Sequence, residues 1–90
     1  SVEYKDAISK VFPNPTNHML YIDYQSASSS SIVLKVFNSI GQEMLNDKLT
    51  VVKGNQLIKL DVATFSEGVY IINIQDTGSG KILQSKFIKD

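Results

Sequence analysis

An Asp-Thr-Gly string at Asp76–Gly78 is the stretch of this sequence most suggestive of catalysis. Aspartic peptidases carry such a string, and its carboxylate shares a proton with a second carboxylate about 3 Å away. Only fourteen residues follow Asp76, too few for the rest of such a lobe. Asp and Gly are also the residues that a hairpin turn demands. We therefore predict a hairpin loop over Asp76–Gly80, and a minimal peptidase built from two copies of Asp76 is the least favoured alternative.

The neighbouring string Gly78-Ser79-Gly80-Lys81 has part of the pattern of a phosphate-binding loop. That motif needs a glycine five residues before Gly80, where Gln75 stands, and a Ser or Thr after the lysine, where Ile82 stands. Both requirements fail. The string is therefore interpreted as part of the same hairpin loop.

Other residue types that carry chemistry are too few or too scattered. His18 is the only histidine, and its neighbours predict a turn leading into a strand, so a surface role is favoured over that of a catalytic base. The absence of cysteine excludes disulfides, thiolate nucleophiles and zinc sites of cysteine type. We predict no enzymatic activity, no catalytic residue, no metal site and no cofactor. The carboxylates lack the spacing of an EF-hand: Asp23, Asp47, Asp61, Glu67 and Asp76.

Composition is that of one ordinary globular domain, with 42% apolar and 20% charged residues. Nine basic and nine acidic residues cancel, so the chain lacks the positive field that binding to nucleic acid usually needs. No apolar run exceeds four residues, which excludes a membrane-spanning helix and the core of a signal peptide. We expect no nucleic-acid partner and no membrane insertion. Either the chain is cytoplasmic or its export signal lies elsewhere.

The densest structural pattern is a strand, a corner and a second strand over Ile58–Gln75. Apolar residues alternate with polar ones on both sides of Ala63–Gly68, which is typical of half-buried β-structure. Gly68 suits a backbone position with positive φ. The hydroxyl of Tyr70 needs a hydrogen-bond partner if its ring is buried. A tyrosine that bonds back to the upstream backbone after a corner is a feature of immunoglobulin-like sandwiches.

The other segments repeat this short alternation between Gly, Asn and Pro breaks, so the fold class is predicted as all-β. The architecture expected is an immunoglobulin-like antiparallel β-sandwich of about seven strands. Residues 1–10 lack a convincing period and are assigned to a linker, with a short edge strand as the alternative. The remaining segments are an extended, helix-free stretch (Val11–Pro15), strands (His18–Tyr24, Ile32–Phe37, Gln42–Asn46, a possible one at Leu49–Val51, and Lys81–Lys89), an exposed loop (Gln25–Ser31) and turns (Asn38–Gly41, Lys53–Asn55).

The order and spacing of several motifs resemble the type A C-terminal sorting domain of the type IX (Por) secretion system of Bacteroidetes. The resemblance covers Val11 to Lys89. Asn38 stands where that family more often has Asp, and Asn serves the same turn chemistry. The residues that carry this resemblance are Val11-Phe12-Pro13-Asn14-Pro15, Leu20-Tyr21-Ile22, Val36-Phe37-Asn38-Ser39-Ile40-Gly41, Leu60-Asp61 with Phe65, Glu67-Gly68-Val69-Tyr70 and Lys86-Phe87-Ile88-Lys89.

The resemblance implies a secretion signal at the end of a larger exported protein. By this analogy, residues 1–10 join an upstream cargo domain to a sorting domain at residues 11–90. The domain would be recognised in the periplasm and direct passage through the outer-membrane secretion machinery. A sortase-like peptidase would then cut in or before residues 1–10 and leave the cargo at the cell surface or outside the cell, joined to lipopolysaccharide.

For partner recognition we predict the terminal strand, Ser85, Lys86, Phe87, Ile88, Lys89 and Asp90, with Lys86 and Lys89 as rim charges. Lysines that merely protect a sheet edge are the equal alternative. A carbohydrate-binding or adhesive module is the competing function, and with no Trp only Tyr4 and Tyr21 are exposed candidates. A role in maintaining the fold is preferred for Pro13, Asn14, Pro15, Asn38, Gly41, Gly68 and Tyr70.

Overall fold

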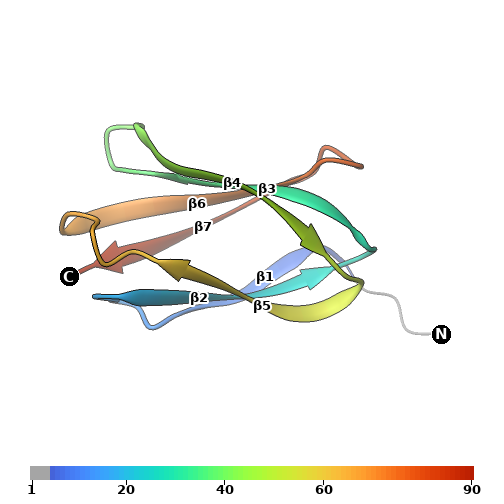
Figure 1. Ribbon diagram of the computed structural model, residues 1–90, viewed down its shortest axis with the longest axis horizontal. Coiled ribbons are helices and arrows are strands. Elements are labelled where there is room, and N and C mark those ends of the chain that lie inside the picture. Colours follow the sequence, from blue (N-terminus) through green and yellow to red (C-terminus); the bar gives the residue numbers. More distant parts are fainter. Residues whose placement is uncertain (1–4) are drawn as a thin grey trace.

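The computed structural model describes residues 5–90, and these form seven β-strands with no helix among them (Figure 1). The alternating pattern and the turn residues therefore predicted the fold class correctly. Residues 1–4, including Tyr4, lie outside the described residues. The strands are β1 (Ala7–Phe12), β2 (Met19–Ser26), β3 (Ser30–Phe37), β4 (Glu43–Val51), β5 (Gly54–Asp61), β6 (Gly68–Asp76) and β7 (Ile82–Lys89).

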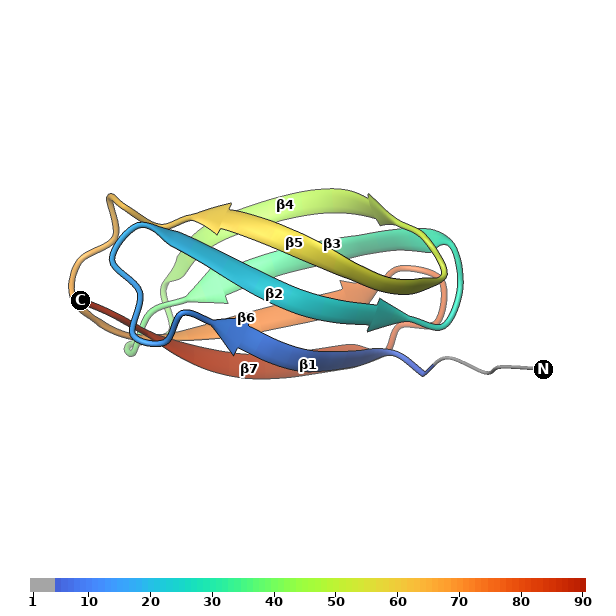
Figure 2. The same ribbon diagram turned by 90° about the horizontal axis from the view of Figure 1, so that it is seen from below.

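Two antiparallel sheets pack face to face, one with strand order β1-β2-β5 and the other with order β4-β3-β6-β7 (Figures 1 and 2). The first, second and fifth strands share a sheet, and the third, sixth and seventh share the other, as in immunoglobulin-like sandwiches. The edge strands β1 and β7 run along one side of the molecule, and β4 and β5 run along the other. The predicted sandwich is confirmed.

The core lies between the sheets and is built from every second residue of the central strands. In β2, for example, Leu20, Ile22 and Tyr24 are buried while the residues between them are half-buried. Full burial of such a side chain contributes roughly 1.5–3 kcal/mol. The buried apolar residues are Leu20, Ile22, Tyr24, Ile32, Leu34, Val36, Val51, Ile58, Leu60, Val62, Tyr70, Ile72, Ile74 and Phe87.

The serine-rich stretch predicted as a long loop is mostly strand. Within Gln25–Ser31, β2 continues to Ser26 and β3 begins at Ser30, so the connection between them is only three residues long. Ser26 is fully buried, and its hydroxyl donates a hydrogen bond of 2.6 Å to the carbonyl of Ser28. The prediction failed because backbone pairing with Gly54 and Val51 extends both strands without any apolar side chain.

The fourth and possible fifth strands expected from the sequence are one continuous strand, β4. Its middle residues Asn46–Lys48 are polar, which interrupted the apolar pattern, yet they pair in register with Lys35–Val33 of β3. An edge strand tolerates such polar residues because one face and one edge meet solvent. The turn expected over Lys53–Asn55 is correspondingly shorter, since β5 begins at Gly54.

Strand β1 includes Ala7–Lys10, four residues that the sequence had assigned to a linker. The apolar period is hidden there because the register with β2 shifts between Ile8 and Lys10. Such a bulge adds one residue and breaks the alternation. Ile8 and Val11 nevertheless pack against the core, so the alternative interpretation of an edge strand holds for this part.

Candidate functional site

Four segments that are far apart in the sequence meet at one end of the sandwich, which we call the motif end. Figure 2 shows the connections β1–β2, β3–β4 and β5–β6 together with the last residues of β7 at this end, whereas β1 begins at the opposite end. The motif end comprises Pro13–Pro15, Asn38–Gly41, Phe65–Gly68 and Ile88–Asp90.

A segment following β1 clasps the outer edge of β7. The side-chain oxygen of Asn14 accepts a hydrogen bond of 2.9 Å from the backbone N–H of Ile88. The N–H of Thr16 donates to the carbonyl of Ile88, and the N–H of Asp90 donates to the carbonyl of Thr16, both at 2.9 Å. Pro13 and Pro15 follow cis peptide bonds and are exposed. The hydrogen bonds to β7 come from the residues Asn14 and Thr16. This clasp of three hydrogen bonds joins the two sheets.

The turn between β3 and β4 is held by the side chain of Asn38. Its Oδ1 accepts hydrogen bonds from the N–H groups of Ile40 at 3.2 Å and Gln42 at 2.8 Å. Gly41 has a φ of +84°, a left-handed conformation that favours glycine. The predicted turn is therefore confirmed, and Ile40 at its tip is 84% exposed.

The corner between β5 and β6 is held by Tyr70, as predicted. The buried ring packs between Phe65 and Phe87, with ring centroids 5.2 and 5.3 Å away, and its hydroxyl donates a 2.6 Å hydrogen bond to the carbonyl of Ser66. Gly68 has a φ of +151°, and an added Cβ would meet no atom within 4 Å. Backbone conformation, rather than space, therefore favours glycine there.

A family model described as the secretion system C-terminal sorting domain matches residues 10–90. The chain belongs to this family. The match extends from Lys10 in β1 to the end of the chain and includes all four segments of the motif end. No curated protein sequence matches the chain. The sorting domain thus carries a signal for the type IX machinery, which exports proteins to the cell surface or beyond, and this family is not one of enzymes.

The terminal strand of the sorting domain exposes only part of the predicted recognition sequence. Lys86, Ile88 and Asp90 are exposed, but the Phe87 side chain is fully buried in the core. The expectation that Lys89 forms a rim charge is wrong, because this residue is only 7% exposed and its ammonium group donates to the carbonyl of Asp90 at 3.0 Å. Strand alternation turns Phe87 and Lys89 inward.

Sequence reasoning missed an apolar patch on the outer face of β6 and β7. Val69 and Ile88 are each 44% exposed and form a cross-strand pair, and Ile71, 37% exposed, pairs with Lys86. A shallow depression of ≈ 350 Å³ beside the patch is lined by Ile71, Gln84, Ser85 and Lys86. The run Val69–Ile72 indicated this patch, because a strand buries only alternate residues of such a run.

Asp76, the residue most suggestive of catalysis, stabilises the β6–β7 hairpin. Its Oδ1 accepts hydrogen bonds from the hydroxyl of Ser30 at 3.0 Å and from the N–H groups of Gly78 at 2.8 Å and Ser79 at 3.2 Å. Burial raises the pKa of this carboxyl, but these three donors outweigh burial and leave the pKa below its usual value. The predicted hairpin loop is confirmed.

The remaining candidate residues do not converge. His18 Nε2 lies 3.8 Å from Asp61 Oδ1, and both side chains are about two-thirds exposed, at 65% and 66%. Within residues 5–90, no three His, Cys, Asp or Glu side chains are grouped closely enough to hold a metal ion. The same residues contain no helix with the length and apolarity needed to cross a membrane. The Tyr21 ring is half-buried, and one of its faces stacks on Phe12 with a centroid distance of 5.5 Å.

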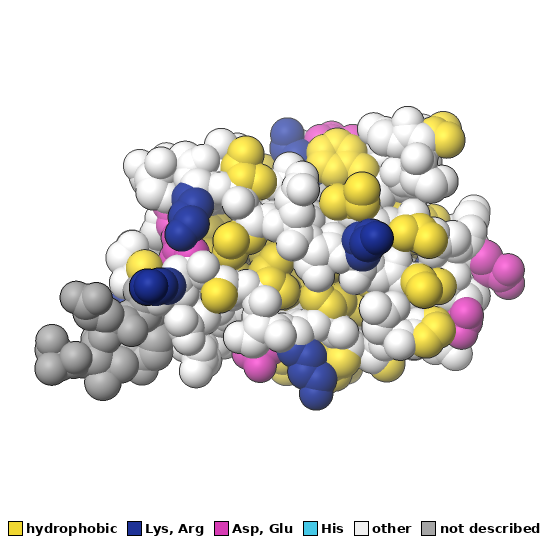
Figure 3. All heavy atoms as spheres, turned by 180° about the vertical axis from the view of Figure 1, so that it is seen from behind, with side chains coloured by type: hydrophobic (Ala, Val, Ile, Leu, Met, Phe, Trp, Pro, Cys, Tyr) yellow, Lys and Arg dark blue, Asp and Glu magenta, His cyan; other side chains and the backbone are white. Residues whose placement is uncertain are grey.

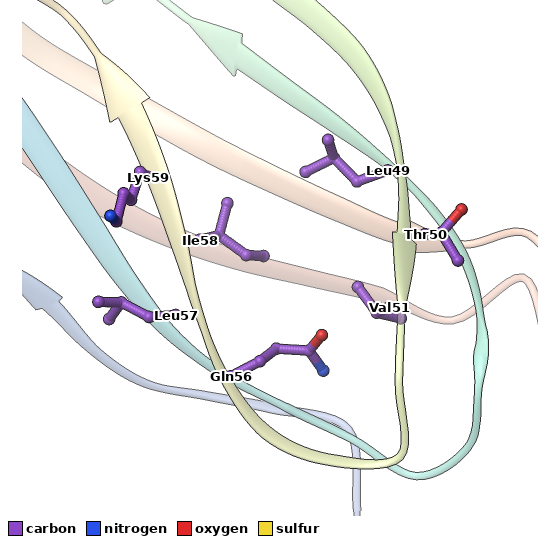
Figure 4. A pocket seen from close by; sticks show the side chains of 7 residues that line it. All are labelled: Leu49, Thr50, Val51, Gln56, Leu57, Ile58 and Lys59. Atoms are coloured by element: carbon purple, nitrogen blue, oxygen red, sulfur yellow. The ribbon is translucent and has the colours of Figure 1, made fainter.

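A second hollow, of ≈ 270 Å³, lies between the edge strands β4 and β5. Figure 4 shows Leu49 and Val51 of β4 facing Ile58 and Gln56 of β5 across it. Gln56 closes one end, because its side-chain amide donates to the carbonyl of Val52 at 2.7 Å and accepts from the N–H of the same residue at 3.2 Å. The hollow holds no cluster of charged groups and is the open side of the core.

Proposed function

We propose that the sorting domain acts as a non-enzymatic export signal whose motif end is bound by the type IX machinery. One observation supports this proposal: four segments that carry the resemblance to the family lie together at one end, while β1 begins at the other. A cargo joined ahead of β1 would therefore extend away from the motif end. Such an arrangement would leave the motif end accessible to the secretion machinery.

The exposed side of the terminal strand is the proposed contact surface. Ile88 of this strand and its cross-strand neighbour Val69 in β6 offer exposed apolar area, and Lys86 adds a charge. Apolar anchors surrounded by polar groups supply most of the binding energy in protein interfaces. Phe87 and Lys89 contribute indirectly, by holding β7 in the sheet.

The family match supports the following steps as part of the same proposal. The domain is bound in the periplasm, the cargo crosses the outer membrane, and a sortase-like peptidase removes the domain and anchors the cargo at the surface. A cut before Ala7 would leave every strand of the sandwich intact, because β1 begins at that residue. A cut within Ala7–Lys10 would first require β1 to separate from β2.

The test is a reporter fused ahead of Ser1 and expressed in a bacterium that has this secretion system. We expect the reporter at the cell surface or in the medium, and in the periplasm when Ile88 and Val69 are both changed to Ser. Leu57→Ser is the matched control, since Leu57 is 49% exposed on the outer face of the other sheet. A wild-type fusion that stays in the periplasm would refute the export signal.

Export of the double variant at the wild-type level would instead exclude Ile88 and Val69 as contacts. These substitutions are preferable to removing Phe87–Asp90, because that deletion takes a buried aromatic side chain out of the core. Cooperative thermal unfolding of the purified variants separates lost recognition from lost folding.

A further inference from the structure

Strand β7 is the outer strand of its sheet, and the hydrogen bonds of Ile88 show which of its backbone groups face outward. The N–H and the C=O of Ile88 bond to Asn14 and Thr16, so both point away from β6. In an antiparallel strand these groups alternate in direction from one residue to the next. The N–H and C=O groups of Lys86, Gln84 and Ile82 therefore point to the same outer edge.

The opposite end of the sheet gives the same alternation independently. The N–H of Thr77 donates to the carbonyl of Ser31, and the N–H of Asp76 donates to the carbonyl of Lys81. With the observed register, these bonds orient alternate residues of β6 toward β3 and toward β7. Leu83 and Ser85 are thus the residues that bond to β6.

The clasp closes only the last part of this edge. Among residues 5–90, Asn14 and Thr16 satisfy the outward groups of Ile88, and no other segment supplies a hydrogen bond to those of Gln84 or Lys86. We call Ile82–Lys86 the open edge. An edge of this kind is a template for pairing with a further strand.

The two edge strands on the side of the open edge carry only basic charged residues. Strands β1 and β7 contain no acidic residue, and their exposed charges are Lys10 and Lys86, since Lys89 is buried. Figure 3 shows hydrophobic atoms gathered along this side, with lysine and acidic side chains around them. The edge strands of the other side differ in carrying both signs of charge: Glu43, Asp47 and Lys48 in β4, and Lys59 and Asp61 in β5.

We propose that the open edge receives an extended, acidic segment of a protein of the export machinery, which pairs with β7 as an added strand. This inference rests on the proposed function and names its mode of binding. Backbone hydrogen bonds at Gln84 and Lys86 hold the segment, and the depression lined by Ile71, Gln84, Ser85 and Lys86 accommodates one of its side chains. Lysines repel basic strands and disfavour neutral ones, so acidic segments are selected.

Gln84→Pro tests the pairing. Proline removes the outward N–H of residue 84 and none of the hydrogen bonds to β6, because Gln84 faces the open edge. Gln84→Ala is the matched control, since it removes the same side chain and keeps the N–H. We expect export of the fused reporter to fall about tenfold with Gln84→Pro and to stay near the wild-type level with Gln84→Ala.

Lys86→Glu tests the charge and leaves the backbone unchanged, so it decides the question if Gln84→Pro unfolds. Export should fall with Lys86→Glu and not with Lys48→Glu, which reverses a charge on β4. Equal export of a folded Gln84→Pro and Gln84→Ala overturns strand pairing, and equal export of the two lysine variants overturns the acidic partner. Loss of export by the wild-type fusion would count against the export signal itself.

Discussion

Asn14 accepts a hydrogen bond of 2.9 Å from the backbone N–H of Ile88, although 74 residues separate the two along the chain. The bond connects the segment after β1, in one sheet, to the last strand of the other sheet. Together with the two backbone hydrogen bonds of Thr16, this bond satisfies outward-facing backbone groups at the end of β7, and the open edge stops short of them. Asn14 therefore joins the two sheets, and it also limits the open edge.

Replacing Asn14 with Ala should lower the free energy of unfolding by about 1 kcal/mol, the usual contribution of one hydrogen bond. Urea denaturation measures this change, and hydrogen exchange should show faster exchange of the Ile88 amide. Asn17→Ala is the matched control, because Asn17 is also exposed and its side chain makes no hydrogen bond within the described residues. The assigned role of the clasp fails if both variants lose the same stability.

Tyr70→Phe should destabilise the domain by about 1 kcal/mol, because it removes the hydrogen bond to Ser66 and keeps the stacked ring. Tyr21→Phe removes a hydroxyl that has no hydrogen-bond partner in the described chain, and its effect should be near zero. Thermal unfolding of the two variants provides the comparison. A larger loss for Tyr21→Phe would contradict the assignment of Tyr70 as the corner residue.

Alanine substitutions at two adjacent residues of β7 should differ strongly in their effect on stability. Phe87→Ala should cost about 3–5 kcal/mol, because it empties a fully buried site between the sheets. Ile88→Ala should change stability by only about 0.5 kcal/mol, because that side chain is 44% exposed. Denaturant titration separates the two, and a folded Ile88→Ala with impaired export would mark Ile88 as a contact residue. Comparable losses of stability would mean that β7 does not alternate as described.

Asp76 should make the stability of the domain sensitive to acid. Its pKa in the folded chain lies below the ordinary value of 3.8, so the charged form is stabilised on folding. The contribution is complete above the unfolded pKa and is lost as the pH falls below 3.8 through the lower folded value. Asp76→Asn should therefore be less stable than the wild type at pH 7, and the difference should shrink in acid. A difference that is independent of pH would contradict this role.

The local pattern of residues predicted much of the fold because its elements depend on near neighbours. Alternation within β2 and β6 identified their buried faces, Asn38 and Gly41 identified a turn, and Tyr70 identified a corner. Each of these features is encoded within a few residues. Bulged or polar strands escaped the same reasoning, since backbone pairing with a neighbouring strand maintains them without an apolar period.

By itself, then, the sequence determined the fold class, the buried faces of β2 and β6, the turn at Asn38–Gly41, the corner before Tyr70 and the family of this sorting domain. Only the tertiary structure decided that the motif segments share one end, that Asn14 clasps Ile88, and that β7 exposes Lys86 while it buries Phe87 and Lys89. The physical reason is the range of the interactions. Turn and strand preferences act between neighbours, whereas edges, clasps and exposed faces arise from pairing and packing between segments far apart in the chain.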